Sequence, residues 1–387
     1  MKIFGHIHGQ HLNIHHWHFV NFKVNKELKQ FYLSIMLRTF ALSLIALFIP
    51  LYLIKEVGLG FSNVLLFYII SVIVYMISAV FGALFCSKLG ARHMMMLIQP
   101  FYILLYALIY LMKFEPSLLI NVAVLSGFAD GFFWLSYHSI FAGSTDKNHR
   151  SEEVSIANVM AILIGVLGPL IGGLIVYYLG FLSLFVFVGC LLIISAVPLY
   201  FTKDLKERFK FKFKDVFNSK HFRDFLGFFG YGAFGIGEAI LWPLFLFLVL
   251  TNYVAVGGLA SLSGIVRAIV SYLTGKAGDK IGKRIFINVG SLLNSLSWFF
   301  RYFFNSVLGV TLVSLYSGLT SMIFEGPFTA LVYDRVNYHK NKLEYLAFRQ
   351  IALGLGQLVI LIVVYYTLSY KLGFILAGIG NLMLMLF

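Results

Sequence analysis

The stretch Gly275-Lys-Ala-Gly-Asp-Lys-Ile-Gly-Lys-Arg284 decides the fold of this chain. It is a short, glycine-rich connection with four cations and one carboxylate, and apolar runs lie on both sides, at 259–273 and 285–304. Such runs are typical of membrane-spanning helices, because about 20 residues at ~1.5 Å each cross a hydrocarbon core about 30 Å thick. Short basic connections stay on the cytoplasmic side. The stretch therefore predicts a cytoplasmic loop between two transmembrane helices.

A weaker copy of this loop lies about half a chain earlier, at Ala83-Leu-Phe-Cys-Ser-Lys-Leu-Gly-Ala-Arg92. The copy keeps Lys88, Gly90 and Arg92 in matching places. A serine replaces the carboxylate of the first loop, Asp279. The copy is therefore recognisable but incomplete.

Two further segments repeat at nearly the same spacing as the loops, which lie 192 positions apart. Residues 48–52 match 241–245 around a proline. Residues 150–152 match 342–344 in a pattern of a cation followed by a glutamate. Three matches in the same order indicate an internal duplication, which is a recurrent architecture among transporters.

The loop pattern G-x-x-x-D-x-x-G-K-R resembles the signature of the major facilitator superfamily, between spans 2 and 3 and again between spans 8 and 9. The resemblance implies an all-α membrane protein with twelve transmembrane helices in two pseudo-symmetric six-helix bundles, acting as a monomer. It also implies that the aspartate pairs with neighbouring helix ends and latches one conformation. The expected latch comprises Gly275, Asp279, Gly282, Lys283 and Arg284, with Lys88, Gly90 and Arg92 in the copy.

The composition excludes a soluble domain, since 60% of the 387 residues are hydrophobic and only 12% are charged, against about 25% charged in ordinary globular domains. The net charge of +14 comes from cations in the connections between apolar runs. Anionic lipid and membrane orientation explain that charge more simply than nucleic acid does. Cys86 and Cys190 both fall inside predicted spans, which argues against a disulfide framework or a metal site.

The first thirty residues are polar and rich in histidine, with six histidines between His6 and His18. Metal capture is one interpretation, because imidazole is a common ligand of transition metals. The favoured interpretation is a segment on the cytoplasmic leaflet with Trp17 and Phe19 dipped into it, since the spacing follows no regular ligand pattern. No cleavable signal peptide is evident.

Twelve apolar runs follow this segment. They predict an amino-terminal bundle at 31–202, a basic cytoplasmic connection at 203–224 and a carboxy-terminal bundle at 225–387. The last run ends with the chain, which predicts a short final helix or a chain cut short at that point. Most Lys and Arg residues fall in the connections after even-numbered spans. This bias predicts a cytoplasmic amino terminus, and we expect a prokaryotic inner membrane.

Ionisable groups at membrane depth are candidates for function, because each costs about 2.5–3.5 kcal/mol to insert. Those within the predicted spans are Arg38, Asp130, His138, Glu238, Arg267 and Glu325. Helical spacing arranges polar and aromatic residues in stripes that predict a wet cavity. The stripes are Asp130, Trp134 and His138; Tyr231, Glu238 and Trp242; and Asn294, Trp298 and Arg301.

Each of these groups also has a structural interpretation. Glu238 and Arg267 are expected to form an ion pair, which serves packing or function equally well. Arg38 can reach the cytoplasmic interface with its long side chain, and His138 can be a satisfied interface histidine. Asp130 and Glu325 have no evident counter-ion on their own helices. Burial raises the pKa of a carboxyl group, so we expect these two to carry the coupled proton.

Span 5 contains a second motif, with a proline that kinks the helix and glycines that admit close packing. It resembles the G-P-x-x-G-G signature of facilitator-type proton antiporters, drug exporters included, and a kinked packing interface is the structural alternative. The residues are Gly165, Gly168, Pro169, Gly172 and Gly173. Those exporters also have an arginine in span 4, which residues 126–131 lack.

Charged residues at the inner ends of spans 4 and 10 and the starts of spans 5 and 11 are expected to form a cytoplasmic gate. Exposed pairs contribute only about 0–1 kcal/mol each, so a gate needs several of them. They are Arg150, Glu152, Glu153, Asp334, Arg335, Lys342 and Glu344.

The function predicted from these features is secondary active transport by alternating access, with proton-coupled export of a small amphipathic solute. One alternative is proton-coupled uptake of a polar metabolite held by Arg267, Asn294, Glu325, Gln350 and Gln357. Another is a non-transporting scaffold or receptor. We expect no enzyme activity, cofactor or metal, because the chain has no HExxH, GxSxG or nucleotide-binding loop. The expected partners are the solute, protons and the bilayer; the sequence does not identify the solute.

Overall fold

The computed structural model describes residues 26–144, 150–200 and 221–387. Side chains are described except at 26–29, 31–32, 143–144, 150–163 and 275–281. The histidine-rich segment up to residue 25 and positions 201–220 of the predicted connection lie outside the described residues.

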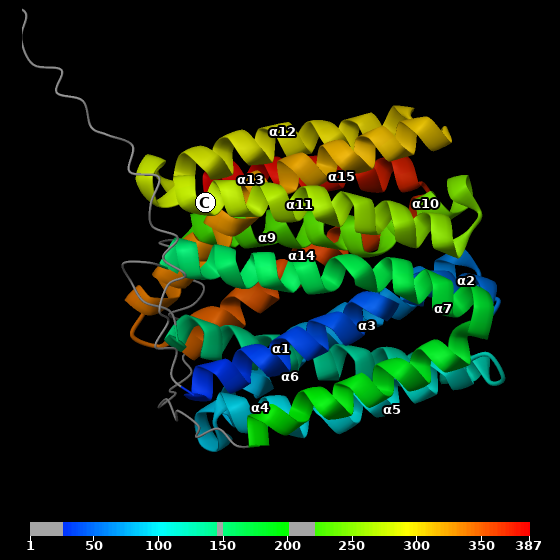
Figure 1. Ribbon diagram of the computed structural model, residues 1–387, viewed down its shortest axis with the longest axis horizontal. Coiled ribbons are helices and arrows are strands. Elements are labelled where there is room, and N and C mark those ends of the chain that lie inside the picture. The colour runs from blue at the N-terminus through cyan, green and yellow to red at the C-terminus, as the bar shows by residue number, and fades with distance from the viewer. Residues whose placement is uncertain (1–25, 145–149, 201–220) are drawn as a thin grey trace, which may run out of the picture.

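All regular secondary structure in the described chain is helical (Figure 1). The first half contains α1 (Lys26–Ile45), α2 (Ile49–Lys55), α3 (Phe61–Leu89), α4 (Ala91–Leu97), α5 (Gln99–Leu111), η1 (Pro116–Leu118), α6 (Leu119–Ser144) and α7 (Arg150–Tyr200). The second half contains α9 (Phe222–Ile236), η3 (Gly237–Leu241), α10 (Trp242–Leu250), α11 (Tyr253–Ile281), α12 (Lys283–Phe303), α13 (Val307–Tyr338), α14 (Lys342–Thr367), α15 (Tyr370–Met383) and η4 (Leu384–Leu386).

Nine helical segments of the described chain are long and apolar enough to cross a bilayer. α7 accounts for only one of them, although it is broken at Gly180, where φ is 78° and ψ is 173°. The predicted count of twelve is reached by taking α7 as two rods and by including α12 and α15. α12 is 21 residues long with a polar buried face, and α15 with η4 covers only Tyr370–Leu386.

The helices of each half pack chiefly on one another. α1 packs on α7 and α3 on α6 in the first half, while α9 packs on α14 and α12 on α13 in the second. The halves meet mainly where α7 contacts α11 and where α3 contacts α14. Figure 1 shows the first half below and the second half above, and the part of α7 before Gly180 lies beside α11 where the halves meet.

The backbone repeats the same unusual positions in both halves. Among the described residues, the positive φ angles of Gly58, Gly90 and Gly180 recur at Thr251, Gly282 and Leu368. Gly90 precedes α4 with φ 95°, and Gly282 precedes α12 with φ 104°. These are the glycines of the two loops, and such angles are readily adopted only by glycine. The repeated geometry agrees with the internal duplication predicted from the sequence.

Both loops lie at one end of the helices, on the left of Figure 1. We call it the basic end, because Lys88, Arg92, Lys283, Arg284 and Arg335 gather there. The other end, which we call the opposite end, contains the turns at Gly58 and Thr251.

Candidate transport pathway

A cavity of about 520 Å³ lies between the two halves. The stripe Asp130, Trp134 and His138 on α6 faces it, as its spacing predicted. α14 contributes a cation and two amides from the other half. The polar and aromatic residues that line this central cavity are Phe67, Tyr68, Ser71, Tyr75, Tyr102, Tyr106, Ser126, Asp130, Trp134, His138, Tyr231, Arg349, Gln350 and Gln357.

Several contacts join the two halves on the side of the central cavity that is nearer the basic end. His138 Nδ1 and the Tyr333 hydroxyl lie 2.8 Å apart, joining α6 to α13. The Asn337 amide donates to the carbonyl oxygen of Ala142 at 3.0 Å. The rings of Phe141 and Tyr333 stack with centroids 5.0 Å apart.

Contacts at the opposite end also join the two halves. The rings of Phe61 and Tyr370 have centroids 4.5 Å apart, and those of Phe181 and Tyr253 are 5.6 Å apart. The Lys55 ammonium lies 5.5 Å from the centroid of the Phe247 ring. The central cavity thus has aromatic contacts between the halves at both ends.

Asp130 is linked to Arg38 through a tyrosine. The Tyr102 hydroxyl donates to Asp130 Oδ1 at 2.6 Å, and the Arg38 guanidinium lies 4.1 Å from the Tyr102 ring centroid. On its other side Arg38 lies 3.6 Å from the Phe133 ring, and it donates to Gln99 Oε1 at 2.8 Å.

The alternative that Arg38 extends to the interface is wrong, since its exposed fraction is 2%. It is also not among the residues that line the central cavity, although we expected it there. Two aromatic faces and an amide oxygen contact the guanidinium inside the first half, while its Nε and Nη2 have no hydrogen-bond partner within the described chain.

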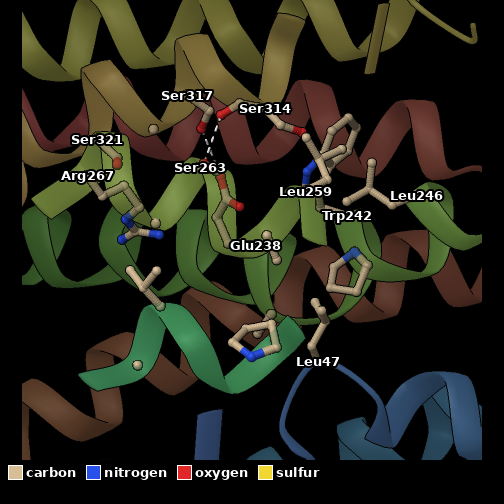
Figure 2. A pocket seen from close by; sticks show the side chains of 18 of the residues that line it. Leu47, Glu238, Trp242, Leu246, Leu259, Ser263, Arg267, Ser314, Ser317 and Ser321 are labelled. Carbon is tan, nitrogen blue, oxygen red and sulfur yellow. Dashed lines mark hydrogen bonds between the residues drawn. The ribbon is translucent and has the colours of Figure 1, made fainter. Parts of the chain in front are cut away.

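A second cavity of about 410 Å³ lies mainly within the second half (Figure 2). Glu238, Trp242, Arg267 and Arg301 line it together with Ser263, Ser314, Ser317 and Ser321. Leu47, Gly165 and Pro169 of the first half complete its wall. Figure 2 shows Glu238 and Arg267 converging on this space with the serines above them.

Two ion pairs cross helices in the second half. Arg301 Nη2 donates to Glu238 Oε1 at 2.8 Å, and Arg267 Nη2 donates to both carboxylate oxygens of Glu325 at 3.1 Å. The expected pair of Glu238 with Arg267 is therefore wrong, and Glu325 does have a counter-ion. The π-helical turn η3 begins at Gly237 and changes the helical register there, so that Glu238 faces α12.

Two residues of the third stripe lie away from the cavities. Asn294 and Trp298 are 0% exposed and line neither of the two cavities. Asn294 Oδ1 accepts from the Thr320 hydroxyl at 2.9 Å, and the Trp298 ring lies 3.9 Å from the Arg301 guanidinium. The expectation that they line a solute cavity is corrected, because close packing of α12 on α13 and α15 encloses this face.

Comparison with known proteins now identifies the family. A family model described as the Major Facilitator Superfamily matches residues 31–226. The chain belongs to this superfamily. It is therefore a multi-pass membrane transporter with the major facilitator fold, and not an enzyme.

Solved structures of this fold resemble the whole chain. A human organic anion transporter is 15% identical with a TM-score of 0.70, covering 93% of this chain and 98% of its own. A proton:xylose symporter of the superfamily is 12% identical with a TM-score of 0.71, covering 94% of each chain. An E. coli fucose:proton symporter is 10% identical with a TM-score of 0.67, covering 93% and 97%. No curated protein matches the chain in sequence.

The antiporter-like motif of this facilitator lies in α7, where α1 and α11 approach closely. A Cβ atom on Gly173 would lie 2.7 Å from the Tyr253 carbonyl oxygen of the other half, and Gly168 and Gly172 similarly face the backbone of α1. Next to Pro169, the Leu170 N–H donates to the Ser261 hydroxyl at 3.2 Å. The motif thus serves close packing of α7 on both α1 and α11, and its link to antiport stays a prediction.

The loop and gate residues are only partly described. Lys283 donates to Asp334 Oδ2 at 2.6 Å, and Arg335 pairs with Asp224. Arg284 donates to the Phe387 carbonyl oxygen at 3.3 Å. The side chains of Asp279, Arg150, Glu152 and Glu153 lie outside the described set. Roles as latch and gate stay predictions.

Sequence reasoning missed one charged residue of the central cavity. Arg349 lies in the second turn of α14 and is 7% exposed. It lies near the start of an apolar run, and a cation at such a position is expected at the membrane interface. The adjacent Gln350 is the signal that could have found it. Two consecutive polar residues lie on two faces of a helix, which indicates that polar groups continue into the span.

Proposed function

We propose that this facilitator is a proton-coupled transporter of a small amphipathic solute, with export as its direction. The observation that supports it most is the central cavity. Tyrosines and a tryptophan surround it, and a single carboxylate, Asp130, lies among its described lining residues. Aromatic faces suit the apolar part of a solute, and a few polar groups suit its polar part.

The contacts at the two ends suggest how access alternates. Opening toward the basic end requires the His138–Tyr333 and Asn337–Ala142 contacts to break. Opening toward the opposite end requires separation of Phe61 from Tyr370. These contacts are small and lie on different helices, so rocking of one half against the other exchanges one set for the other.

Asp130 is the carboxylate that we propose to carry the proton. It faces the central cavity, and its described hydrogen bond comes from a neutral hydroxyl. Protonation removes the cost of enclosing a charge while the cavity closes. Glu325 is the second candidate, because its protonation would weaken the ion pair with Arg267 and so link proton binding to the second cavity.

Uptake of a polar metabolite is the second candidate function. Gln350 and Gln357 line the central cavity, as this alternative expects, and two of the similar structures are proton symporters of sugars. Asn294 is buried elsewhere, and Arg267 lines the second cavity. The metabolite would therefore contact Gln350 and Gln357 but not Arg267, Asn294 or Glu325.

Proteoliposomes with an imposed pH gradient test both functions. Export by antiport predicts that added solute drives protons out of the compartment into which the solute moves. Symport predicts proton movement in the same direction as the solute. A solute that is transported without any proton signal would contradict proton coupling, and the variant Asp130→Asn is the matched control.

Orientation and assembly belong to the same proposal. We propose a cytoplasmic basic end in a prokaryotic inner membrane and a monomeric transporter. Single cysteines in place of Arg223 at the basic end and Ser117 at the opposite end, in a background lacking Cys86 and Cys190, report sidedness. Labelling of the Ser117 site from the cytoplasm would contradict this orientation.

A further inference from the structure

Arg349 lies in the central cavity without an acidic partner among the described residues. Its one described hydrogen bond runs from Nη1 to Gln350 Oε1 at 3.3 Å. Its guanidinium lies 5.9 Å from the ring of Phe228, and its Nε has no hydrogen-bond partner within the described chain. A guanidinium buried without a carboxylate is costly, and an anion that enters the central cavity would compensate its charge.

The neighbouring amide presents a second donor. Gln350 is 0% exposed, and its Nε2 has no hydrogen-bond partner in the part of the chain that the structure describes. Its Oε1 accepts from the Tyr75 hydroxyl at 2.5 Å and from Arg349. Two donors on one oxygen fix the orientation of the amide, since a flipped amide would place its NH₂ group against the Arg349 donor. The amide NH₂ therefore remains available to an acceptor.

The carboxylate of the same cavity does not serve as that acceptor. Asp130 accepts from Tyr102, which lies against Arg38, and no described ion pair joins it to Arg349. Arg267 and Arg301 by contrast have their glutamates. Arg38 also has no carboxylate among its described partners, but it is enclosed between two rings and is not a lining residue. Arg349 is thus the guanidinium that faces the central cavity.

We propose that Arg349 and Gln350 form a subsite for the oxyanion group of the transported solute, so that the solute is an amphipathic organic anion. Guanidinium and amide donors suit a carboxylate or sulfonate, which accepts from both at once. Tyr75 comes from α3 and orients Gln350 on α14, so the subsite depends on both halves. This inference rests on the proposed function and specifies its solute.

Matched probe pairs test the subsite by equilibrium binding to purified protein in phosphatidylcholine nanodiscs. The pairs are benzoate with benzamide, and naphthalene-2-sulfonate with naphthalene-2-sulfonamide. We expect tighter binding of the anion in each pair. Arg349→Gln should weaken anion binding about 10- to 100-fold and change amide binding less than about 3-fold. The control Arg223→Gln removes an exposed arginine outside both cavities and should leave the preference intact.

Equal affinity for the two members of each pair, or binding of neither, overturns the proposal. If Arg349→Gln does not fold, Arg349→Lys and Gln350→Met replace it. Each variant should lower the preference for the anion several-fold, because one replaces the planar guanidinium and the other removes the amide donor. If both variants keep the full preference, the subsite is overturned. Loss of probe binding when phosphatidylglycerol is added assigns the subsite to a lipid headgroup instead and overturns the solute assignment.

Binding is measured without a gradient, so its outcome is separate from that of the transport assay. Anion preference without any proton signal would remove proton coupling and leave the subsite. A proton signal driven by a neutral solute, with no anion preference, would remove the subsite and leave the proposed function.

Discussion

The two halves of the molecule enclose similar arginines but neutralise them differently. Arg38 lies between the rings of Tyr102 and Phe133 and is 2% exposed. Arg301 lies between the rings of Trp242 and Trp298 and is 1% exposed. Arg301 also has a carboxylate, whereas Arg38 has an amide oxygen.

Of the three carboxylates Asp130, Glu238 and Glu325, only Asp130 therefore has no arginine among its described ion-pair partners. Glu238 and Glu325 are engaged by arginines, while Asp130 has the Tyr102 hydroxyl as its described partner. A carboxylate bonded to a neutral group can gain a proton without leaving a cation behind. The comparison therefore favours Asp130 of the first half over Glu238 and Glu325 as the carboxylate of the proposed proton exchange.

Breaking the ion pair in the second half should have the largest effect on stability. Arg301→Met leaves the Glu238 carboxylate without its partner, which costs about 3–5 kcal/mol for a buried pair. Arg38→Met should cost about 1–3 kcal/mol, because it leaves only an amide unsatisfied. Thermal unfolding in detergent compares the two variants. The double variant Glu238→Gln/Arg301→Met should recover part of the loss, and equal losses for both arginines would contradict the comparison.

Removing the carboxylate of the first half should affect coupling more than stability. Asp130→Asn keeps a hydrogen bond with Tyr102, so we expect its melting temperature to stay near that of the wild type. Solute-evoked proton movement in proteoliposomes should fall to background, while solute exchange without a gradient persists. Glu325→Gln is the counterpart in the second half, and retention of full coupling in both variants would exclude these two residues from proton transfer.

The hydrogen bond from Tyr75 to Gln350, which joins the two halves, should contribute less to the free energy of unfolding than the Arg301 ion pair does. Tyr75→Phe removes one donor, and a typical hydrogen bond contributes about 0.5–1.5 kcal/mol. Gln350 Oε1 still accepts from Arg349, so no buried acceptor is left empty. Unfolding of Tyr75→Phe is compared with that of Tyr316→Phe, whose hydroxyl bonds within the second half. If Tyr316→Phe impairs transport and Tyr75→Phe does not, the contact between the halves has no role in transport.

The smallest effect is expected at the basic end. Lys283→Gln breaks the ion pair with Asp334. Each of these two side chains is about one fifth exposed. Partly exposed pairs contribute about 0–1 kcal/mol, and added salt should weaken this one further. Unfolding at low and at high salt concentration measures it. A loss larger than that of Arg301→Met would reverse the expected order of the two ion pairs.

Local sequence patterns predicted most of the helices and the loops. Apolar runs of about 20 residues can satisfy their backbone groups in lipid only as helices, so the helices were evident, whereas their ends were predicted only to within a few residues. The glycines of the two loops were recognised from spacing, and their positive φ angles explain why glycine occupies them. The stripe on α6 was also predicted, because helical periodicity persists through it.

Partner choice could not be predicted in the same way. Glu238 was expected to pair with Arg267, but it pairs with Arg301. The π-helical turn η3 adds to the register between Tyr231 and Trp242, so these residues of one stripe line different cavities. Arg349 was missed because its environment is made by helices from both halves.

The sequence by itself therefore determined that this chain crosses a membrane, that its halves are related and, with the exception of Arg349, which charged residues line the two cavities. Those properties depend on residues near one another in the chain, through hydropathy, helical period and backbone preference. Only the tertiary structure decided which charge neutralises which, and which donors of the described chain remain without an acceptor in the central cavity. Those properties depend on the rotation and crossing of helices that are far apart in sequence, and small changes in register alter them completely.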